Sequence, residues 1–391
     1  MTKTQIGAAV AAVALSFSLS SLAAEVRVYG IIDEGLSYMS KDFDDGNSSD
    51  DTFEVKSGMS LGSRVGIKGE EDLGNGLKVG FILENGFESD SGEFAKATST
   101  RLFGREASLY LADDTYGTIA FGRLQHLTAG YGTWGIAAPI LNPFAIGWSD
   151  HIAGYKNVFG FNSGRLDNVI AYKSPTFGNF TAYAQWSSNT DQYNGPEGAE
   201  ENKGTADRYG SVGLAYRGER LSAVGIVEWN PWSSKRPDTA KADDGIAVTL
   251  GANYRFDFGK LYLAGQYFDN QWRLPTPSEI VPLAFNDGKL NDRMVKGYGL
   301  IAGANIPAFG GEALFALGYR DAELVNYSDI GATRVSGTIG YKYPLSKRTN
   351  IYTAASYTRD DLDKQVTVGS EETENVNPHA VQVVLGLVHR F

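Results

Sequence analysis

The chain contains no cysteine, which excludes a disulfide framework, a thiolate nucleophile and a cysteine-ligated metal site. Its histidines are few, and the spacing of His126, His151, His379 and His389 fits no metal-binding or catalytic motif. Basic residues are outnumbered, with Lys+Arg 35 against Asp+Glu 46 and a net charge of −11. A nucleic-acid-binding protein needs a basic face for phosphates, so this class is not expected.

Long apolar runs are also missing, apart from one at the N-terminus. Lys3 precedes an apolar run from Ile6 to Leu19, and Ser21-Leu22-Ala23 places small residues where a signal peptidase cleaves. This pattern predicts a secretory signal peptide at residues 1–23, the alternative being a short buried helix. No other run approaches the ~18 apolar residues that a membrane-spanning helix needs. We therefore expect an exported protein with a single domain at 24–391.

From Glu25 onward the chain shows short runs in which apolar and other residues alternate. Clear examples are 77–84, 334–343 and 381–388. A period of two predicts β-strands, and a strand of about ten residues suits a tilted membrane crossing.

The connections between these runs are of two kinds. Seven are tight turns rich in Gly, Asp, Asn and Pro: Asp72–Gly76, Asp113–Gly117, Pro175–Asn179, Gly218–Arg220, Asp257–Lys260, Pro307–Gly311 and Pro344–Thr349. Eight are longer and more polar: 41–57, 89–100, 124–165, 188–206, 231–244, 271–293, 321–332 and 360–378. Fifteen connections of alternating length predict an all-β fold, a 16-stranded antiparallel transmembrane β-barrel.

Aromatic residues near the short turns, among them Phe177, Phe180, Tyr254, Phe256 and Tyr343, predict an interfacial girdle. The alternative is a soluble β-sandwich with aromatic core residues. Sixteen strands in one sheet would leave exposed edges unless the sheet closed. A closed barrel of this size encloses a water-filled lumen, which accounts for polar inward faces in a membrane protein.

The connection 124–165 differs from the others. It has neither helical nor strand periodicity, and its aromatic content argues against disorder. An irregular segment of this length is usually functional. We expect it to fold into the barrel and bury its aromatic residues: Trp134, Phe144, Trp148, Tyr155, Phe159 and Phe161.

Several motifs resemble one family over almost the whole mature chain. They are Val28-Tyr29-Gly30-Ile31-Ile32-Asp33, the run Gly62–Gly74, Leu83-Glu84-Asn85-Gly86-Phe87, Phe103-Gly104-Arg105, Tyr116-Gly117, Phe121-Gly122-Arg123 and Val388-His389-Arg390-Phe391. The chain resembles the trimeric general porins of Gram-negative outer membranes. The resemblance implies a homotrimer surrounded by outer-membrane lipid and lipopolysaccharide. It also implies a C-terminal strand recognised by the barrel-insertion machinery, and an inward third loop that narrows a channel for small hydrophilic solutes.

The resemblance implies a pore constriction formed by Arg64, Glu84, Arg105 and Arg165, with Asp150 as the acidic group on the loop. Strand parity independently places Arg64 and Glu84 in the lumen, because an arginine on the lipid face costs about 2–4 kcal/mol. Arg105 shares its parity with Ala107, Leu109 and Leu111, so a lumen position requires a bulge near Gly104 or a strand that is apolar on both faces. Further candidate pore-lining residues are Lys68, Arg101, Arg123 and Lys156.

Other interpretations concern ligands and assembly. The aspartates at 42, 44, 45, 50 and 51 and the glutamates at 371, 372 and 374 could hold Ca²⁺, although a solvated loop is the simpler interpretation and no cofactor is expected. Apolar residues on both parities of the first strand (Val26, Val28, Ile31, Ile32 and Leu36) suggest a subunit interface formed by strands one to five.

The functional expectation is a passive channel with a modest anion preference, set by the arginines of the constriction. The alternative within transport is a solute-specific channel for small organic acids or sugars, in which Trp134 and Trp148 form an apolar slide. An outer-membrane hydrolase is not expected, because no nucleophile, base and orienting group can be identified. A purely structural or adhesive barrel would not need an inward loop flanked by arginines.

Overall fold

The computed structural model of the chain describes residues 25–42, 50–95, 101–129, 133–152, 157–160, 164–192, 195–235, 243–272, 294–325, 327–363, 366–368, 371–373 and 377–391. The expected signal peptide lies outside these residues, as do Tyr155, Lys156 and Phe161 of the connection 124–165. Within the described ranges, no helix is long and apolar enough to cross a membrane.

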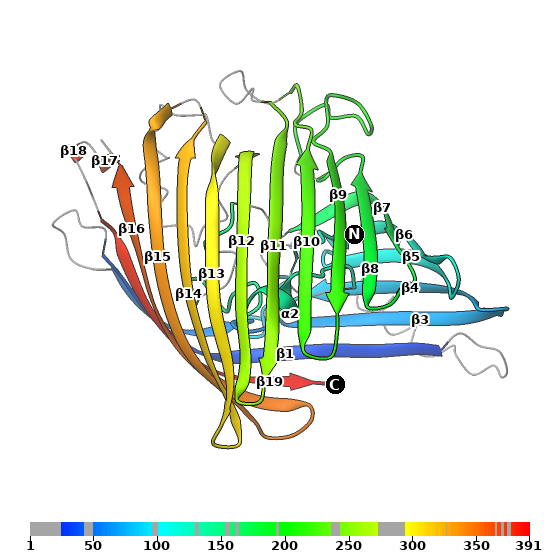
Figure 1. Cartoon of the computed structure of the whole chain (residues 1–391), viewed down its shortest axis with the longest axis horizontal. Coiled ribbons are helices and arrows are strands. Elements are labelled where there is room, and N and C mark those ends of the chain that lie inside the picture. Colours follow the sequence, from blue (N-terminus) through cyan, green and yellow to red (C-terminus); the bar gives the residue numbers. More distant parts are fainter. Residues whose placement is uncertain are drawn as a thin grey trace.

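A single antiparallel sheet closes into a barrel (Figure 1). Its strands are β1 (Glu25–Asp42), β2 (Asp50–Ser57), β3 (Arg64–Gly74), β4 (Leu77–Gly86), β5 (Glu106–Asp113), β6 (Gly117–Gln125), β7 (Arg165–Lys173), β8 (Phe180–Ser187), β9 (Tyr209–Arg217), β10 (Leu221–Asn230), β11 (Gly245–Phe256), β12 (Gly259–Trp272), β13 (Met294–Ala308), β14 (Gly311–Leu324), β15 (Tyr327–Pro344), β16 (Thr349–Asp363) and β19 (His379–Arg390). A separate hairpin pairs β17 (Val366–Val368) with β18 (Glu371–Thr373). In Figure 1 the strands of the near wall run upright, and β1 and β3–β5 cross behind them at a wide angle, as tilted strands of a closed barrel do.

The first and last strands close the barrel. β1 pairs with β19 from Ile31 opposite Arg390 to Asp42 opposite His379. Beyond this ladder, Phe391 and Gly30 exchange two backbone hydrogen bonds of 3.1 and 3.2 Å. This pairing closes the sheet, as a barrel requires, and removes both open edges.

The second strand of the barrel is broken, which explains why the sheet contains seventeen segments while the barrel has sixteen strands. β2 pairs with the second half of β1 and β3 with the first half. Between them the chain bends at 58–63, starting at Gly58 with φ +67°. The carboxylate of Asp33 accepts hydrogen bonds from the backbone N–H groups of Ser60 (2.8 Å) and Leu61 (2.6 Å). The bend is therefore held by a buried acceptor on β1.

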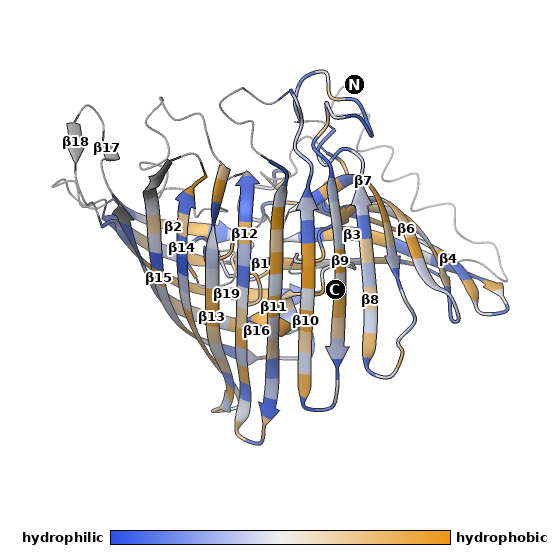
Figure 2. Cartoon of the chain, turned by 45° about the horizontal axis from the view of Figure 1, so that its top comes forward, coloured by the Kyte–Doolittle hydropathy of each residue, from blue (hydrophilic) through white to orange (hydrophobic). Residues whose placement is uncertain are grey.

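Each strand presents apolar residues outward and polar or small residues inward. Along β19, Val383, Leu385 and Leu387 are exposed while Gln382 and Val384 are fully buried, which agrees with the alternation predicted at 381–388. Figure 2 shows the same alternation as hydrophobic and hydrophilic bands along the near strands.

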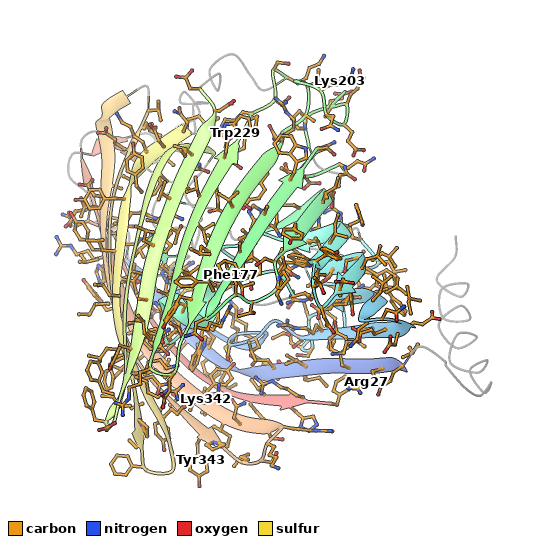
Figure 3. All side chains as sticks on the ribbon, turned by 45° about the vertical axis from the view of Figure 1, so that its right-hand side comes forward. Arg27, Phe177, Lys203, Trp229, Lys342 and Tyr343 are labelled. Atoms are coloured by element: carbon orange, nitrogen blue, oxygen red, sulfur yellow. The ribbon has the colours of Figure 1, made fainter. Side chains whose placement is uncertain are left out.

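Aromatic residues form girdles at both ends of the barrel. Phe177 and Tyr343 lie at short turns and Trp229 at the long-loop end (Figure 3). Trp229 lies beside Trp186, with their ring centroids 6.1 Å apart. The sequence predicted only the girdle at the short turns. Two girdles bracket the apolar band that contacts the hydrocarbon core.

Two sequence expectations about the strands were wrong. The connections expected at 41–57 and 321–332 are largely strand, because β2 covers Asp50–Ser57 and β15 begins at Tyr327; hairpin pairing continues there despite the polar composition. In β1, Val26, Val28, Ile32 and Leu36 all share one exposed face, and only Ile31 has the opposite parity. The strand is therefore not apolar on both faces.

Candidate functional site

The described part of 124–165 lies against the inner wall of the barrel. The side-chain amide of Asn253 on β11 donates to the Ile140 carbonyl at 3.0 Å. The backbone N–H of His151 donates to Gln382 on β19 at 2.8 Å. Both wall residues belong to the buried faces of their strands. These strands are far apart around the barrel, so the segment crosses its interior.

Small residues on the wall make room for this segment. A Cβ at Gly251 would come within 2.4 Å of Leu141, which lies on the short helix α2 (Ala138–Leu141), and one at Gly340 within 2.8 Å of Phe144. The Trp148 ring packs edge-on against Phe144 and against Tyr352 on β16, with centroids 5.0 Å apart in both cases. A larger wall residue would displace the segment towards the lumen axis.

Trp134 and Trp148 are both only 3% exposed, in the apolar core between the segment and the wall. In the alternative of a solute-specific channel, these two rings could form an apolar slide; that part of the alternative is wrong, because neither ring faces the water-filled space. Hydrophobic burial of these rings anchors the segment to the wall. Composition alone does not distinguish aromatic residues that pack against the wall from aromatic residues that face the lumen.

An ion-paired cluster forms where β3, β4 and the residue before β5 meet. Nε of Arg105 lies 2.7 Å from Oε1 of Glu84, and Nη1 of Arg64 lies 3.8 Å from the same oxygen. Arg105 precedes β5, which begins at Glu106, but its backbone N–H still donates to the Glu84 carbonyl at 3.1 Å, while Glu106 is the register partner of Glu84. Arg105 and Glu106 thus both lie opposite Glu84, as in the β-bulge that the sequence predicts near Gly104.

Two further charged residues border this cluster. Arg165 is the first residue of β7, and its Nε donates to the Arg105 carbonyl at 2.8 Å. Glu106 is 2% exposed and accepts hydrogen bonds from Ser108 (2.9 Å) and Thr133 (3.0 Å). Glu106 was not predicted from the sequence. Its strand parity, which it shares with Ser108 and not with Leu109, was the signal that its side chain faces inward.

Asp150 borders the same cavity as this cluster. Its carboxylate is 2.7 Å from Nζ of Lys56 on β2, a residue that sequence reasoning also missed. A cavity of about 740 Å³ is bordered by Lys56, Arg64, Arg105, Asp150 and Arg165, together with the more peripheral Glu54, Glu88, Asp90 and Glu93. The structure thus brings four predicted residues around one cavity, with the fifth, Glu84, paired to its arginines.

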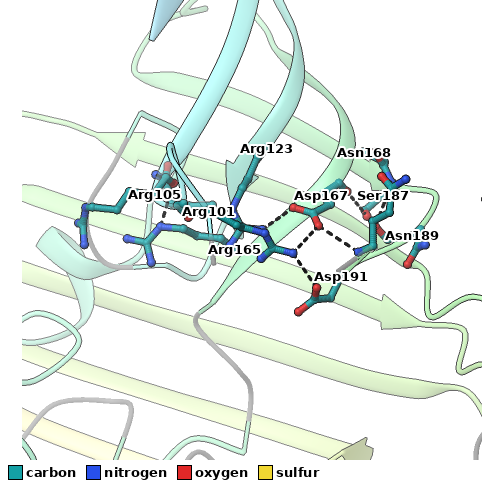
Figure 4. A network of polar contacts seen from close by, with 12 residues as sticks. Arg101, Arg105, Arg123, Arg165, Asp167, Asn168, Ser187, Asn189 and Asp191 are labelled. Atoms are coloured by element: carbon teal, nitrogen blue, oxygen red, sulfur yellow. Dashed lines mark hydrogen bonds and ion pairs between the residues drawn. The ribbon is translucent and has the colours of Figure 1, made fainter. Parts of the chain in front are cut away.

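The other candidate residues lie elsewhere. Arg101 contacts Asp167 (2.9 Å) and Asp191 (2.7 Å), and Arg123 contacts Asp167 (2.5 Å), as the dashed lines in Figure 4 show. These two arginines are thus neutralised within their own network. Lys68 lies over the Tyr29 ring, 5.3 Å from its centroid, and borders a different cavity.

Two histidines lie in the inward segment. Burial is the main cause that lowers the pKa of His126 to about 3 and that of His151 to about 4; Arg123 and Arg334, respectively, add to the effect. Both side chains are therefore neutral at physiological pH. Among the described residues, no group of three or more His, Asp or Glu side chains could hold a metal ion.

A closed antiparallel barrel with apolar outer faces, aromatic girdles and a charged inner cavity defines an outer-membrane channel. The family model described as Gram-negative porin matches residues 8–363, and the chain belongs to this family, in the Gram-negative outer membrane. An outer membrane porin protein of Bordetella pertussis is 29% identical over 86% of this chain and 89% of its own. Outer membrane porin protein 32 of Delftia acidovorans is 29% identical over 84% of this chain and 82% of its own. Among solved structures, an anion-selective porin from Comamonas acidovorans has a TM-score of 0.66 at 23% identity, covering 94% of this chain and all of that one.

Proposed function

We propose that the chain forms a passive channel for small hydrophilic solutes, with a modest anion preference set by Arg64, Arg105 and Arg165. The observation that carries this proposal is the convergence of these arginines on one cavity, where Glu84 is the acid paired with two of them. With Glu106 also counted, the cluster keeps a small positive excess.

The acids at the periphery of the cavity act differently. Glu88, Asp90 and Glu93 belong to a loop on the long-loop side, and Asp90 and Glu93 are exposed. Exposed charges are screened beyond about 8 Å at physiological salt. Close to the arginines, the low-dielectric wall focuses the field on a passing ion. The local cluster therefore outweighs the net charge of −11.

Assembly and partners are part of the proposal. A homotrimer is supported by family membership and by a Vibrio cholerae OmpT structure described as a trimer form, which has a TM-score of 0.57 with this chain. We place barrel strands one to five, which are β1–β6, at its centre, and outer-membrane lipid and lipopolysaccharide around the remaining strands. The barrel-insertion machinery would recognise the C-terminal strand. The chain acts as a channel and not as an enzyme.

Planar-bilayer recording under a salt gradient tests this function. We expect stepwise conductance and a reversal potential on the anion side that grows as the salt concentration falls. An absence of conductance steps would overturn the proposal that the chain forms a channel. A cation-side reversal potential would overturn the role of the arginines while leaving the channel intact.

A further inference from the structure

A second group of cations lies at the opposite end of the barrel, at the short turns. We call Arg217, Arg220, Arg255, Lys260, Lys342 and Arg390 the cationic belt. Arg255 is directly opposite Lys260 in the β11–β12 register, and its backbone N–H donates to the Arg220 carbonyl at 2.8 Å. Short turns of outer-membrane barrels face the periplasm. The belt therefore lies at the periplasmic mouth.

Strand alternation directs these side chains into the lumen. Arg255 shares its parity with the buried Thr249 and Asn253, and Lys342 with the buried Ser336 and Thr338. Nζ of Lys260 lies 5.7 Å from the ring centroid of Tyr262, an inward residue that is 7% exposed.

The residues next to the belt face the other way. Phe256, Tyr343 and Phe391 each follow a belt cation, and each is exposed on the lipid side. Lys342 and Tyr343 are both marked at the short-turn end in Figure 3. Aromatic rings therefore occupy the membrane interface at this level, and the cations occupy the water-filled mouth.

Charge compensation within the belt is incomplete. Arg220 pairs with Asp257 at 3.1 Å, and Glu312 is opposite Lys342 in the β14–β15 register. Over the described part of the chain, no ion pair within 4.0 Å involves Arg217, Arg255, Lys260 or Arg390. Like charges directly opposite each other destabilise a sheet. The cross-strand pair of Arg255 and Lys260 thus costs stability, which an anion in the mouth would offset.

The opposite arc of the same mouth is balanced. There a cavity of about 630 Å³ is bordered by both signs, including Lys78 and Glu70, which form an ion pair of 3.2 Å. The arc from β9 to β19 therefore differs from the arc of β1 and β3–β5, and its cations do not follow from a generally basic rim.

We propose that the cationic belt is a binding site for small multivalent anions, such as phosphates and polycarboxylates, at the periplasmic mouth. The site is separate from the arginine cluster at the constriction. It makes the channel asymmetric, because multivalent anions accumulate at one mouth only. This proposal rests on the proposed channel function.

Sided block by inorganic pyrophosphate tests the site. Lys203 is exposed on a long loop, so Lys203→Cys in this cysteine-free chain allows a bulky thiol label to report which side each channel presents. We expect pyrophosphate to reduce single-channel conductance at lower concentration from the short-turn side. The triple variant Arg255→Gln/Lys260→Gln/Lys342→Gln should weaken that block by about tenfold. The reason is that it removes three positive charges that lie within about a Debye length of the bound multivalent anion.

The controls separate this site from the constriction. Lys78→Gln removes a cation at the same mouth that is already paired with Glu70, and it should leave the block unchanged. Arg64→Ser/Arg165→Ser should shift ion preference but retain the sidedness of the block. The proposal is overturned by equal block from both sides, or by wild-type block in the triple variant. A protein without conductance would instead refute the channel function. Folding of each variant is checked by heat-modified mobility before recording.

Discussion

The Tyr352 hydroxyl donates a 2.5 Å hydrogen bond to Oδ1 of Asp33, and this contact links β16 to β1 across the intervening β19. The other oxygen of the same carboxylate holds the bend at 58–63. One buried acid therefore connects the closure of the barrel to the segment that precedes Arg64.

Replacing Asp33 by Ala should lower the free energy of unfolding by about 2 kcal/mol or more, because several donors to a charged acceptor lose their partner. Tyr352→Phe should cost less, since Asp33 keeps both backbone donors. Urea unfolding in detergent micelles, followed by tryptophan fluorescence, measures both. Equal losses in the two variants would contradict the role of Asp33 at the bend.

Replacing Arg64 and Arg165 together by Ser should move the reversal potential towards cations. Changing the five aspartates at 42, 44, 45, 50 and 51 to Asn should barely alter it, because hydrated loop charges are screened. Both variants are recorded under the same salt gradient. If the loop aspartates prove to be the stronger determinant, the constriction does not set the selectivity.

Glu84→Gln should increase the anion preference, because it removes the acid that contacts Arg64 and Arg105. The effect should be larger at low salt, where screening is weaker. Glu323→Gln is a matched control, since Glu323 forms a half-exposed pair of 2.9 Å with Lys296. A similar shift of the reversal potential in both variants would show that the position of the acidic residue in the barrel does not determine its effect on ion selectivity.

Arg334 and Asp360 form a fully buried pair at 2.6 Å, and Arg334 also donates to the Asn157 carbonyl at 3.3 Å. Arg334→Gln should therefore destabilise the barrel by about 3–5 kcal/mol and loosen the inward segment. Arg359→Gln breaks an exposed pair with Asp361 and should cost about 1 kcal/mol or less. Urea unfolding gives both values, and current noise reports the loosening. Similar costs would show that burial does not govern these pairs.

Stability should fall as the pH drops below about 6.5, the ordinary pKa of histidine. His126 and His151 have folded-state pKa values of about 3 and about 4, so the unfolded chain takes up protons first. The contribution of these two histidines to the free energy of unfolding is complete above about pH 6.5. It is lost as the pH falls towards their folded-state pKa values. His126→Gln should reduce this dependence in unfolding measured at pH 5 and pH 7. An unchanged slope would place the cause on other groups.

The barrel can be predicted from local patterns in the chain. A period of two, alternating connection lengths and the absence of a second long apolar run leave a closed sixteen-stranded sheet as the arrangement without open edges. Parity alone directed Arg64 and Glu84 inward, because each strand has one lipid face and one lumen face. Both patterns are local, because each depends only on residues that are close together in the sequence.

Which charges meet could not be predicted from the chain alone. Arg105 reaches the Glu84 side chain because Arg105 and Glu106 both lie opposite Glu84, and Asp150 pairs with Lys56 of a strand that is distant in sequence. The break between β2 and β3 depends on Asp33, and burial of Trp134 and Trp148 depends on the wall that they face. Side-chain partners across a barrel are set by register and by the path of the inward segment, and neither has a local signal in the chain.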